Sequence, residues 1–429
     1  MVKHTEMSTP PRWHALVGGG LFNIALGSYY AWSVFVAPLQ AEFHWTRLQA
    51  TSVASIEMVM LAVMYNVAGL LIDRLGARAI AVIGGLCFSF GMMLASFSQN
   101  LLELYLSGGL LLGLGLGFGY LPPLSVGFKW YPEARGLVGG LAVGIFAAGS
   151  GIVGPLAGGF KPFGWGGLIS IMGWRHTFQL LGAVYFAFTM LGSYWLKDPP
   201  EHFVPPVAPA RTAATKVSSV NLTTARMMRL PSFWILWIAY VFGCIAGTMT
   251  ISQVAPFATA ALGAATAAFA IPVGAAGSAL GRFFSGWISD HLGRVVTLRV
   301  ILVVSMIAAP ALYLFQSGAA AFFILLFLVY YGYGTQLSVY TALAGDFYGP
   351  KHSAKNYGVL LLAWGTAGIF GPILGGFVFD TYKSYEYAFY AAAAASLVSL
   401  ALLGIARAPT EAQIEEIAIS PRTPVLLAE

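Results

Sequence analysis

Long apolar stretches separated by short polar ones run through most of the chain. A helix needs about 20 apolar residues to cross the hydrocarbon core of a bilayer. Twelve stretches are of that length, and they predict helices at residues 14–38, 48–72, 79–98, 101–127, 137–160, 176–196, 233–257, 264–289, 299–316, 320–344, 356–379 and 387–406. The pattern predicts an all-α membrane protein with twelve transmembrane helices.

The longest polar interruption divides these helices into two groups of six. Residues 198–230 are rich in Pro, Ala, Ser and Thr, which indicates a linker, with a short surface helix expected at 221–229. We therefore expect five parts. They are a cytoplasmic N-terminal segment (1–13), a first six-helix bundle (14–197), a cytoplasmic linker (198–230), a second six-helix bundle (231–406) and a cytoplasmic tail (407–429).

Composition agrees with this class. Of the 429 residues, 58% are hydrophobic and only 9% are charged, whereas soluble domains carry about 25% charged residues. The 51 glycines suit helices that pack closely in lipid. The net charge of +6 is spread over short loops and does not indicate a nucleic-acid partner. Both cysteines fall within apolar runs, so no disulfide framework is predicted.

The basic residues predict the orientation in the membrane. With the N-terminus in the cytoplasm, 17 of the 22 Lys and Arg residues fall in inside segments and four in outside segments. Arg282 is the remaining one, and it lies within a predicted helix. Cytoplasmic loops carry the excess of Lys and Arg, so both termini are expected in the cytoplasm and the chain in the inner (plasma) membrane.

The two halves repeat one another at a constant shift of 217 residues, without gaps. Parallel repeats of this kind place a substrate site between the halves near the middle of the membrane and open it alternately to each side. The pairs related by the shift are Gly69 and Gly286, Asp73 and Asp290, Gly76 and Gly293, Gly115 and Gly332, Gly117 and Gly334, Gly151 and Gly368, Gly154 and Gly371, Pro155 and Pro372, Gly158 and Gly375, and Gly159 and Gly376.

The loop 69–78, with the sequence GLLIDRLGAR, resembles the signature loop of the major facilitator superfamily, and the Gly-Pro-x-x-Gly-Gly runs resemble its fifth-helix motif. The resemblance extends from about residue 14 to 406. Four shorter strings are similar to the oxalate:formate antiporter and bacterial monocarboxylate transporter group. They are YAWS at 30–33 with Pro38, WYP at 130–132 with Arg135-Gly136, PSFW at 231–234 and SAKNYG at 353–358.

The repeated loop indicates gating and no covalent chemistry. Asp73 and Asp290 lie at the ends of the second and eighth predicted helices. A carboxylate there can pair with basic groups and with the N-terminus of a neighbouring helix. We expect both to hold the cytoplasmic gate shut, together with Arg74 and Arg135. Simple topology-fixing surface charge explains Arg74 about as well.

Arg282 is the strongest candidate for the substrate site. An arginine at membrane depth costs several kcal/mol unless it faces a cavity or a partner, and its guanidinium matches a carboxylate in a bidentate way. The resemblance implies the same, because the family's substrate-binding arginine falls on this position. The alternative is a structural arginine paired with a buried acid, but Ser278 and Gly286 occupy the positions one turn away.

Polar aromatic residues are the expected supporting ligands. The resemblance places the group's cavity aromatics on Tyr30, Tyr120 and Tyr333, whose hydroxyl groups can donate to a carboxylate. Asn23 and Gln336 extend the polar stripe at helical spacing. Packing between helices is the alternative for each single tyrosine.

One departure from the family pattern bears on the substrate. Oxalate carriers place a lysine where this chain has Trp364. A second uncompensated charge in a medium of low dielectric is costly, so one cation suits a monoanion. We therefore expect a small monocarboxylate such as lactate, pyruvate, formate or acetate, with Trp364 closing the cavity. An oxalate/formate-type antiporter is the alternative.

Glu57 is the other charge predicted at membrane depth, about 13 Å along the membrane normal from Arg282 by the helical rise per residue. Burial favours the neutral form of a carboxyl group, which makes Glu57 a candidate for proton coupling. A hydrogen-bonded glutamic acid at a helix interface is an equal alternative.

The sequence gives no reason to expect an enzyme or a cofactor. Its seven histidines show no metal-ligand spacing, and no Gly-Lys-Ser/Thr phosphate loop is present. We expect a secondary active transporter, a monomer in the lipid bilayer, with a small organic anion and protons as its partners. A carrier for another solute, such as nitrate or a polyol, and a transporter-like sensor stay open.

Overall fold

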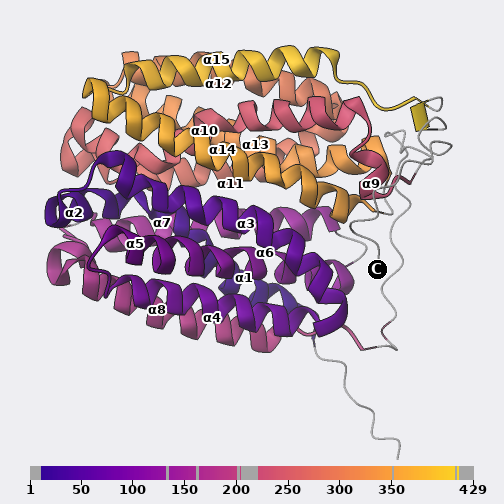
Figure 1. Ribbon diagram of the computed structural model, residues 1–429, viewed down its shortest axis with the longest axis horizontal. Helices are drawn as coiled ribbons and strands as arrows, with labels where there is room; N and C mark the ends of the chain where they lie inside the picture. The colour runs from indigo at the N-terminus through magenta and orange to yellow at the C-terminus, as the bar shows by residue number, and fades with distance from the viewer. Residues whose placement is uncertain are drawn as a thin grey trace, which may run out of the picture.

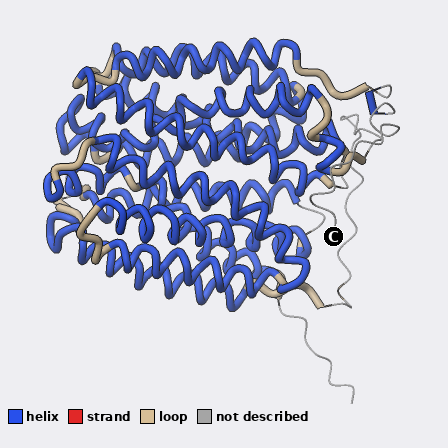
Figure 2. The backbone as a smooth tube through the Cα atoms, in the orientation of Figure 1, coloured by secondary structure: helices blue, strands red, loops and turns tan. Residues whose placement is uncertain are grey.

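The structure is a computed structural model that describes residues 11–131, 135–160, 164–200, 203, 221–349, 352–410 and 413–414. Within these ranges the fold is helical, and no strand is present beyond a single bridge between Phe160 and Trp165. Figure 2 shows the helices as long tubes lying side by side. The all-α prediction is confirmed. The predicted segments 1–13, 198–230 and 407–429 lie largely outside the described residues.

The first half of the chain, indigo to magenta in Figure 1, forms the lower group of helices in that view. Its elements are α1 (Trp13–Gly27), the 3-10 helix η1 (Ser28–Ala31), α2 (Ser33–Phe43), α3 (Arg47–Leu75), α4 (Ala77–Ala95), α5 (Leu101–Leu104), the π-helix η2 (Tyr105–Leu111), α6 (Leu112–Trp130), α7 (Arg135–Gly158) and α8 (Leu168–Trp195).

The second half forms the upper group in Figure 1. It begins with the short α9 (Thr224–Met227), which is the helix expected at 221–229. The long elements that follow are α10 (Pro231–Ala267), α11 (Ala270–Leu292), α12 (Arg294–Leu314), α13 (Ala319–Tyr348), α14 (Ser353–Tyr382) and α15 (Glu386–Ile405).

Nine helices of the described part are long and apolar enough to cross a membrane, and ten are if the bent pair α1–η1 and α2 counts as one span. The chain is therefore a multi-pass membrane protein. Helices α8 and α11, of 28 and 23 residues, lie among the others but do not pass this test of apolar composition. The count of twelve spans stays a prediction.

The first predicted helix, 14–38, is not one straight element. It breaks directly after η1, at Trp32, where the segments Trp13–Ala31 and Ser33–Phe43 meet at 49°. A Cβ atom at Gly27 would lie 1.6 Å from the carbonyl oxygen of Phe146 in α7. The two backbones therefore touch directly before the break, which places Tyr29 and Tyr30 in the interior.

The predicted boundary near residues 257–264 is also wrong. Helix α10 continues to Ala267 and changes direction at Gly263, whose φ of 74° lies in the left-handed region that favours glycine. Helix α8 begins at Leu168, before the predicted 176, and has a similar break at Gly173. An apolar pattern alone continues through both glycines, so it does not locate these breaks.

The two halves have matching packing. Helix α3 packs on α6 as α11 packs on α13, and α1 packs on α8 as α10 packs on α15. The predicted shift of 217 recurs in single contacts: Gly151 faces Ala275, and Gly368 faces Met58. These two pairs join the halves, α7 to α11 and α14 to α3. Pseudo-symmetry thus extends to the interface between the halves.

Candidate functional site

Arg282 lies in the interior, between the two halves. It is only 2% exposed, and its Nη1 donates to the carbonyl oxygen of Val143 in α7 at 3.1 Å. Its Nη2 donates to the hydroxyl oxygen of Tyr30 at 2.9 Å, while its Nε has no hydrogen-bond partner. No carboxylate pairs with it among the ion pairs of the described residues. The guanidinium therefore faces neither lipid nor an acid.

A chain of hydrogen bonds continues from Arg282 across the interface. The hydroxyl oxygens of Tyr30, in η1, and Tyr333, in α13, lie 3.0 Å apart. The indole Nε1 of Trp364, in α14, donates to the hydroxyl oxygen of Tyr333 at 2.7 Å. Arg282, Tyr30, Tyr333 and Trp364 are thus joined in one line, with a donor at each end.

This network of four side chains leaves one phenolic hydrogen without an acceptor among them. Arginine and tryptophan side chains are donors only, whereas each phenol can donate one hydrogen and accept others. The two phenols share one bond, so only one of their two hydrogens is used between them. The spare O–H belongs to Tyr30 or Tyr333, and a buried donor without a partner costs about 1–3 kcal/mol. This network of hydrogen bonds therefore favours the binding of an additional hydrogen-bond acceptor.

This network of hydrogen bonds borders a small cavity, to which each half of the polypeptide contributes four lining residues. Tyr30, Leu61, Tyr120 and Phe146 come from the first half, and Arg282, Leu337, Leu361 and Trp364 come from the second. Its volume is about 10 Å³, which is near the minimum for one water molecule. A carboxylate therefore needs the cavity to widen. Arg282 is the one charged residue among those that line it.

Asn23 and Gln336 do not line this cavity, although both are buried. The amide of Asn23 donates to the carbonyl oxygen of Ala142 at 3.1 Å. Gln336 lies beside Gly243, where an added Cβ would be 3.0 Å from its Nε2. The amide oxygens of Asn23 and Gln336 have no partner. Their role as substrate ligands stays a prediction and requires a wider cavity.

The apolar wall of the cavity was not predicted. Phe146 is central to it, because its ring contacts those of Tyr30 and Tyr120 with centroids 5.7 and 4.9 Å apart. The other apolar wall residues are Leu61, Leu337 and Leu361. Leucine and phenylalanine are frequent throughout this sequence, so these four positions carry no distinguishing signal. Only the fold assembles them.

Glu57 lies in a different cavity, within the first half. It is 1% exposed, and Arg282 is not among the residues around it. The two buried charges therefore line separate cavities.

The halves are joined at one end of the bundle by a carboxylate at a helix N-terminus. Asp380, in α14, accepts hydrogen bonds from the backbone N–H groups of Arg47 and Leu48, at 3.1 and 3.0 Å. These are the first two residues of α3 in the other half, where a negative charge is favourable. This contact therefore closes the end of the bundle that is predicted to face outward.

The Arg47 side chain adds to the same contact. It donates to the hydroxyl oxygen of Tyr385 at 2.7 Å and lies over the ring of Phe379 at 4.2 Å. Tyr385 in turn donates to Gln253 at 3.0 Å, and burial raises the pKa of Tyr385 to about 12. Elsewhere in the interface the contact between the halves is apolar, because Phe160 of the first half packs edge to face on Phe269 of the second.

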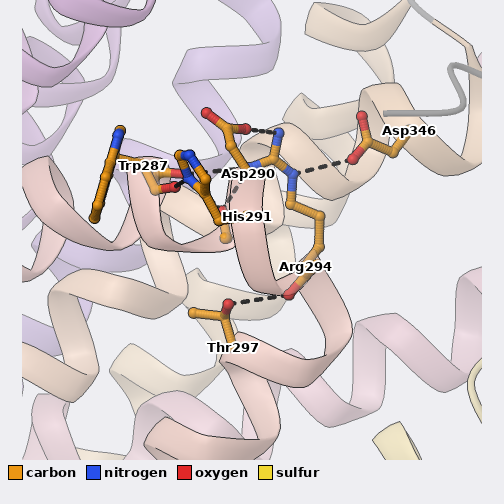
Figure 3. Close-up of polar contacts among 9 residues, drawn as sticks. Trp287, Asp290, His291, Arg294, Thr297 and Asp346 are labelled. Carbon is orange, nitrogen blue, oxygen red and sulfur yellow. Dashed lines mark hydrogen bonds and ion pairs between the residues drawn. The ribbon is translucent and has the colours of Figure 1, made fainter. Parts of the chain in front are cut away.

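At the opposite end, Arg294 joins three helices of the second half (Figure 3). It lies between Asp290, at the end of α11, and Asp346, in α13, and it pairs with both carboxylates. Its side chain is 13% exposed, whereas that of Asp290 is 55% exposed. Asp290 therefore pairs within its own half in this structure, and its role in gating stays a prediction.

The gating candidates of the first half are less fully described. Arg74 is exposed. The side chains of Asp73 and Arg135 lie outside the described residues, although both residues belong to helices. Within the described residues, Asn66 makes a cross-half contact at this end, where its amide donates to the carbonyl oxygen of Gly358 in α14 at 2.8 Å. The cavity is thus closed toward both ends.

The comparisons with known proteins agree with this architecture. The family profile described as Major Facilitator Superfamily matches residues 17–335 and 313–428. The chain is 31% identical to the uncharacterized MFS-type transporter YhjX of Escherichia coli (strain K12) over 360 residues, which cover 83% of this chain and 86% of the relative. It is 26% identical to the oxalate:formate antiporter of Oxalobacter formigenes over 398 residues, or 91% and 90% of the two chains.

Two further matches support less, because one covers under half of each chain and the other has a low sequence identity. Monocarboxylate transporter 2 of Homo sapiens is 34% identical over 188 residues, which cover 42% of this chain and 37% of that protein. A crystal structure of a bacterial homolog of the human lysosomal transporter Spinster has a TM-score of 0.65, with 96% of this chain and 98% of that chain covered. At 19% identity the latter match supports the fold alone.

Proposed function

Because the chain belongs to the major facilitator superfamily, we propose that it is a secondary active transporter that moves a small monocarboxylate across the inner membrane by alternating access. The observation that supports this most directly is the hydrogen-bond chain from Arg282 to Trp364. This hydrogen-bond network has a donor at each end, Arg282 and Trp364, and one of its phenolic hydrogens has no acceptor within it. An anion that only accepts hydrogen bonds completes it.

The chemistry of the donors favours a carboxylate. The Nε hydrogen of Arg282 is buried without a partner, and a guanidinium edge binds two carboxylate oxygens side by side. A phenolic O–H from Tyr30 or Tyr333 lies within the same network. Nη1 and Nη2 each donate one of their two hydrogens, to Val143 and Tyr30, so each keeps a second N–H for an anion. The bound anion would then offset a buried positive charge that has no acid beside it.

The cavity wall favours a small anion with a single charge. Arg282 supplies the one formal charge in it, and the leucines and Phe146 surround the space beyond. A second carboxylate in those apolar surroundings would need its own cation, because desolvating an unpaired ion costs several kcal/mol. Lactate, pyruvate, acetate and formate fit these limits.

Transport would follow from separation of the halves at one end at a time. The Asp380 contact closes one end, and Asn66 contacts Gly358 at the other. The anion would bind across the interface, to Arg282 of one half and Tyr30 of the other. Alternate release of the two closures then exposes the site to each side in turn.

The transport mode has two candidates. Proton co-transport is the first, with Glu57 as the candidate proton carrier. Anion exchange is the second, and the similarity to the oxalate:formate antiporter of Oxalobacter formigenes over 91% of this chain favours it. Even under exchange, the single cation in the cavity favours monoanions over oxalate.

Uptake of radiolabelled lactate into proteoliposomes, with and without an inward proton gradient, tests the proposal. We expect saturable uptake by the wild-type protein and its loss in Arg282→Gln. Arg299→Gln is the matched control, because Arg299 is also a helix arginine but bonds to carbonyl oxygens of Leu403 and Gly404, away from the cavity. Wild-type uptake by Arg282→Gln would contradict the proposal. Formate, acetate, pyruvate, nitrate and a polyol as competitors define the substrate class.

A further inference from the structure

A second cavity lies around Glu57, within the first half of the polypeptide. Its volume is about 10 Å³, near the minimum for one water molecule. Six elements contribute lining residues in addition to α3, which carries Glu57: η1, α2, α4, α6, α7 and α8. The lining residues are Ser28, Tyr29, Trp32, Phe35, Glu57, Phe88, Met92, Leu112, Val153 and Tyr185.

Three polar side chains in this cavity have oxygen atoms without hydrogen-bond partners. They are Oε2 of Glu57 and the hydroxyl groups of Tyr29 and Tyr185. All three residues are at most 5% exposed. Buried polar atoms are nearly always paired, and an exception requires an explanation. A water molecule or a proton carried by Glu57 supplies the missing partners.

None of the described residues that line the cavity around Glu57 carries a positive charge. The titratable groups around it are Tyr29, from η1, and Tyr185, from α8. Helices α4, α6 and α7 contribute only Phe88, Met92, Leu112 and Val153. Helix α14 reaches the neighbouring Met58 through Gly368 and adds no residue to the cavity. An ionised carboxylate here would lack compensation, so the neutral acid is the stable form of this closed state.

The ligand chemistry favours a proton over a metal ion. Ca²⁺ takes six to eight oxygen ligands and Mg²⁺ near-ideal octahedral geometry. The cavity offers one carboxyl group and a few hydroxyl groups, and the rest of its wall is apolar. A proton needs only one carboxylate oxygen, and a neighbouring hydroxyl can accept the hydrogen bond of the resulting acid.

The 3-10 turn η1 connects this cavity to the Arg282 site. Ser28 and Tyr29 line the Glu57 cavity, and the next residue, Tyr30, bonds to Arg282. The rings of Tyr29 and Tyr30 lie 4.1 Å apart, and both pack on Phe146. Because the two tyrosines are adjacent and in contact, a shift of Tyr30 on anion binding displaces Tyr29 at the wall of the other cavity.

We propose that Glu57 is the proton-binding site of this transporter and that the turn Ser28–Ala31 couples it to the anion site. This inference rests on the proposed function. One proton from water on one side of the membrane adds to a carboxylate oxygen of Glu57. The neutral acid permits the closed state, and the same proton leaves to water on the other side. Proton and anion thus bind in separate cavities.

Two transport assays on the same proteoliposomes test the proposal. The first is accumulation of labelled lactate driven by a gradient of one pH unit, which supports about tenfold accumulation at one proton per anion. The second is exchange of labelled for unlabelled lactate without a gradient. We expect Glu57→Gln to lose accumulation and keep exchange within about twofold, because a neutral amide mimics the protonated acid permanently. A pH-sensitive dye in the vesicles should show no proton entry with this variant.

Further variants keep the inference falsifiable. Glu57→Asp keeps a carboxyl group and should retain part of the accumulation. Tyr29→Phe keeps the ring contact with Tyr30 and should lower accumulation less than Glu57→Gln. Accumulation by Glu57→Gln at the wild-type level would overturn the proton site, as would equal loss of exchange in a variant with wild-type thermal stability. Absence of both activities in the wild-type protein would instead overturn the proposed function.

Discussion

The hydroxyl oxygens of Tyr30 and Tyr333 lie 3.0 Å apart and join the two halves of the chain at the centre of the interface. The rings meet edge to face, with centroids 6.1 Å apart. Each hydroxyl also accepts a hydrogen bond from a fixed donor, Arg282 or Trp364. An anion that bonds to this pair acts on both halves at once, so its affinity depends on how they are arranged.

The first prediction concerns this pair. We expect the single variants Tyr30→Phe and Tyr333→Phe to weaken lactate binding little, because the phenol that remains no longer bonds to the other and keeps one free O–H. The double variant has no phenolic donor, and we expect it to bind lactate about tenfold more weakly, since a hydrogen bond to a charged group contributes roughly 1.5 kcal/mol or more. The KM of lactate uptake and the Kd from tryptophan fluorescence provide the measurement.

Tyr313→Phe is the control, since its hydroxyl bonds to Ser384 far from the cavity. It should leave both constants unchanged. A tenfold loss in either single variant would contradict this prediction, because it would show that the remaining hydroxyl group cannot replace the one removed.

The second prediction concerns Trp364. We expect Trp364→Lys to bind oxalate at least about tenfold more tightly than the wild-type protein does, because a second cation can pair with the second carboxylate. Lactate affinity should fall, since the indole no longer donates to Tyr333. Thermal stabilisation by oxalate and by lactate, measured side by side, checks this. Trp364→Met, which removes the indole without adding charge, should lose lactate affinity and gain none for oxalate.

The sequence predicted the fold because the signals involved are regional. Twenty-residue apolar stretches and glycines repeated at a shift of 217 follow from the bilayer and from close helix contacts. Gly76 and Gly293 illustrate this, since both end a helix with a positive φ, of 81° and 90°. The breaks near Trp32 and at Gly263 were missed because the apolar stretch continues through both, and serines such as Ser28 and Ser33 are also found within continuous helices.

The candidate site was only partly predictable. Arg282 is conspicuous because a charge at membrane depth is rare, and the resemblance supplied Tyr30, Tyr333 and Trp364. Their connection into one chain follows from distances between side chains of different helices, which no spacing in the sequence specifies. Asn23 and Gln336 share the helical stripe of the tyrosines but do not line the cavity. Helical phase therefore predicts a polar face of each helix and does not specify which side chains of that face reach the cavity.

The third prediction concerns the Arg294 cluster of Figure 3. Arg294→Gln leaves Asp346 partly buried and unpaired, at 26% exposure of its side chain. We expect a loss of thermal stability corresponding to about 1–3 kcal/mol, the cost of an orphaned polar partner. Asp290→Asn should cost much less, because that carboxylate is mostly exposed and such pairs contribute little. Equal losses in the two variants would contradict this ranking.

The fourth prediction concerns the closure by Asp380. Its carboxylate accepts from two N–H groups at the start of α3, and such a charge–dipole contact contributes up to about 1–2 kcal/mol. Asp380→Asn should therefore favour separation of the halves at this end by roughly five- to thirtyfold, as 1.4 kcal/mol is a factor of ten. An asparagine retains the size and one acceptor oxygen, so the loss combines the charge with one of the two hydrogen bonds.

Pulsed electron paramagnetic resonance can detect that separation. Spin labels at His44 and Lys383, which are exposed residues of opposite halves at this end, report the distance in a protein whose Cys87 and Cys244 are replaced by serine. We expect Asp380→Asn to raise the share of long distances. Asp346→Asn, at the other end, should not change that share, because its carboxylate pairs only within the second half. If neither variant moves the distribution, then Asp380 does not hold this end closed, and packing such as that of Phe160 on Phe269 is sufficient to do so.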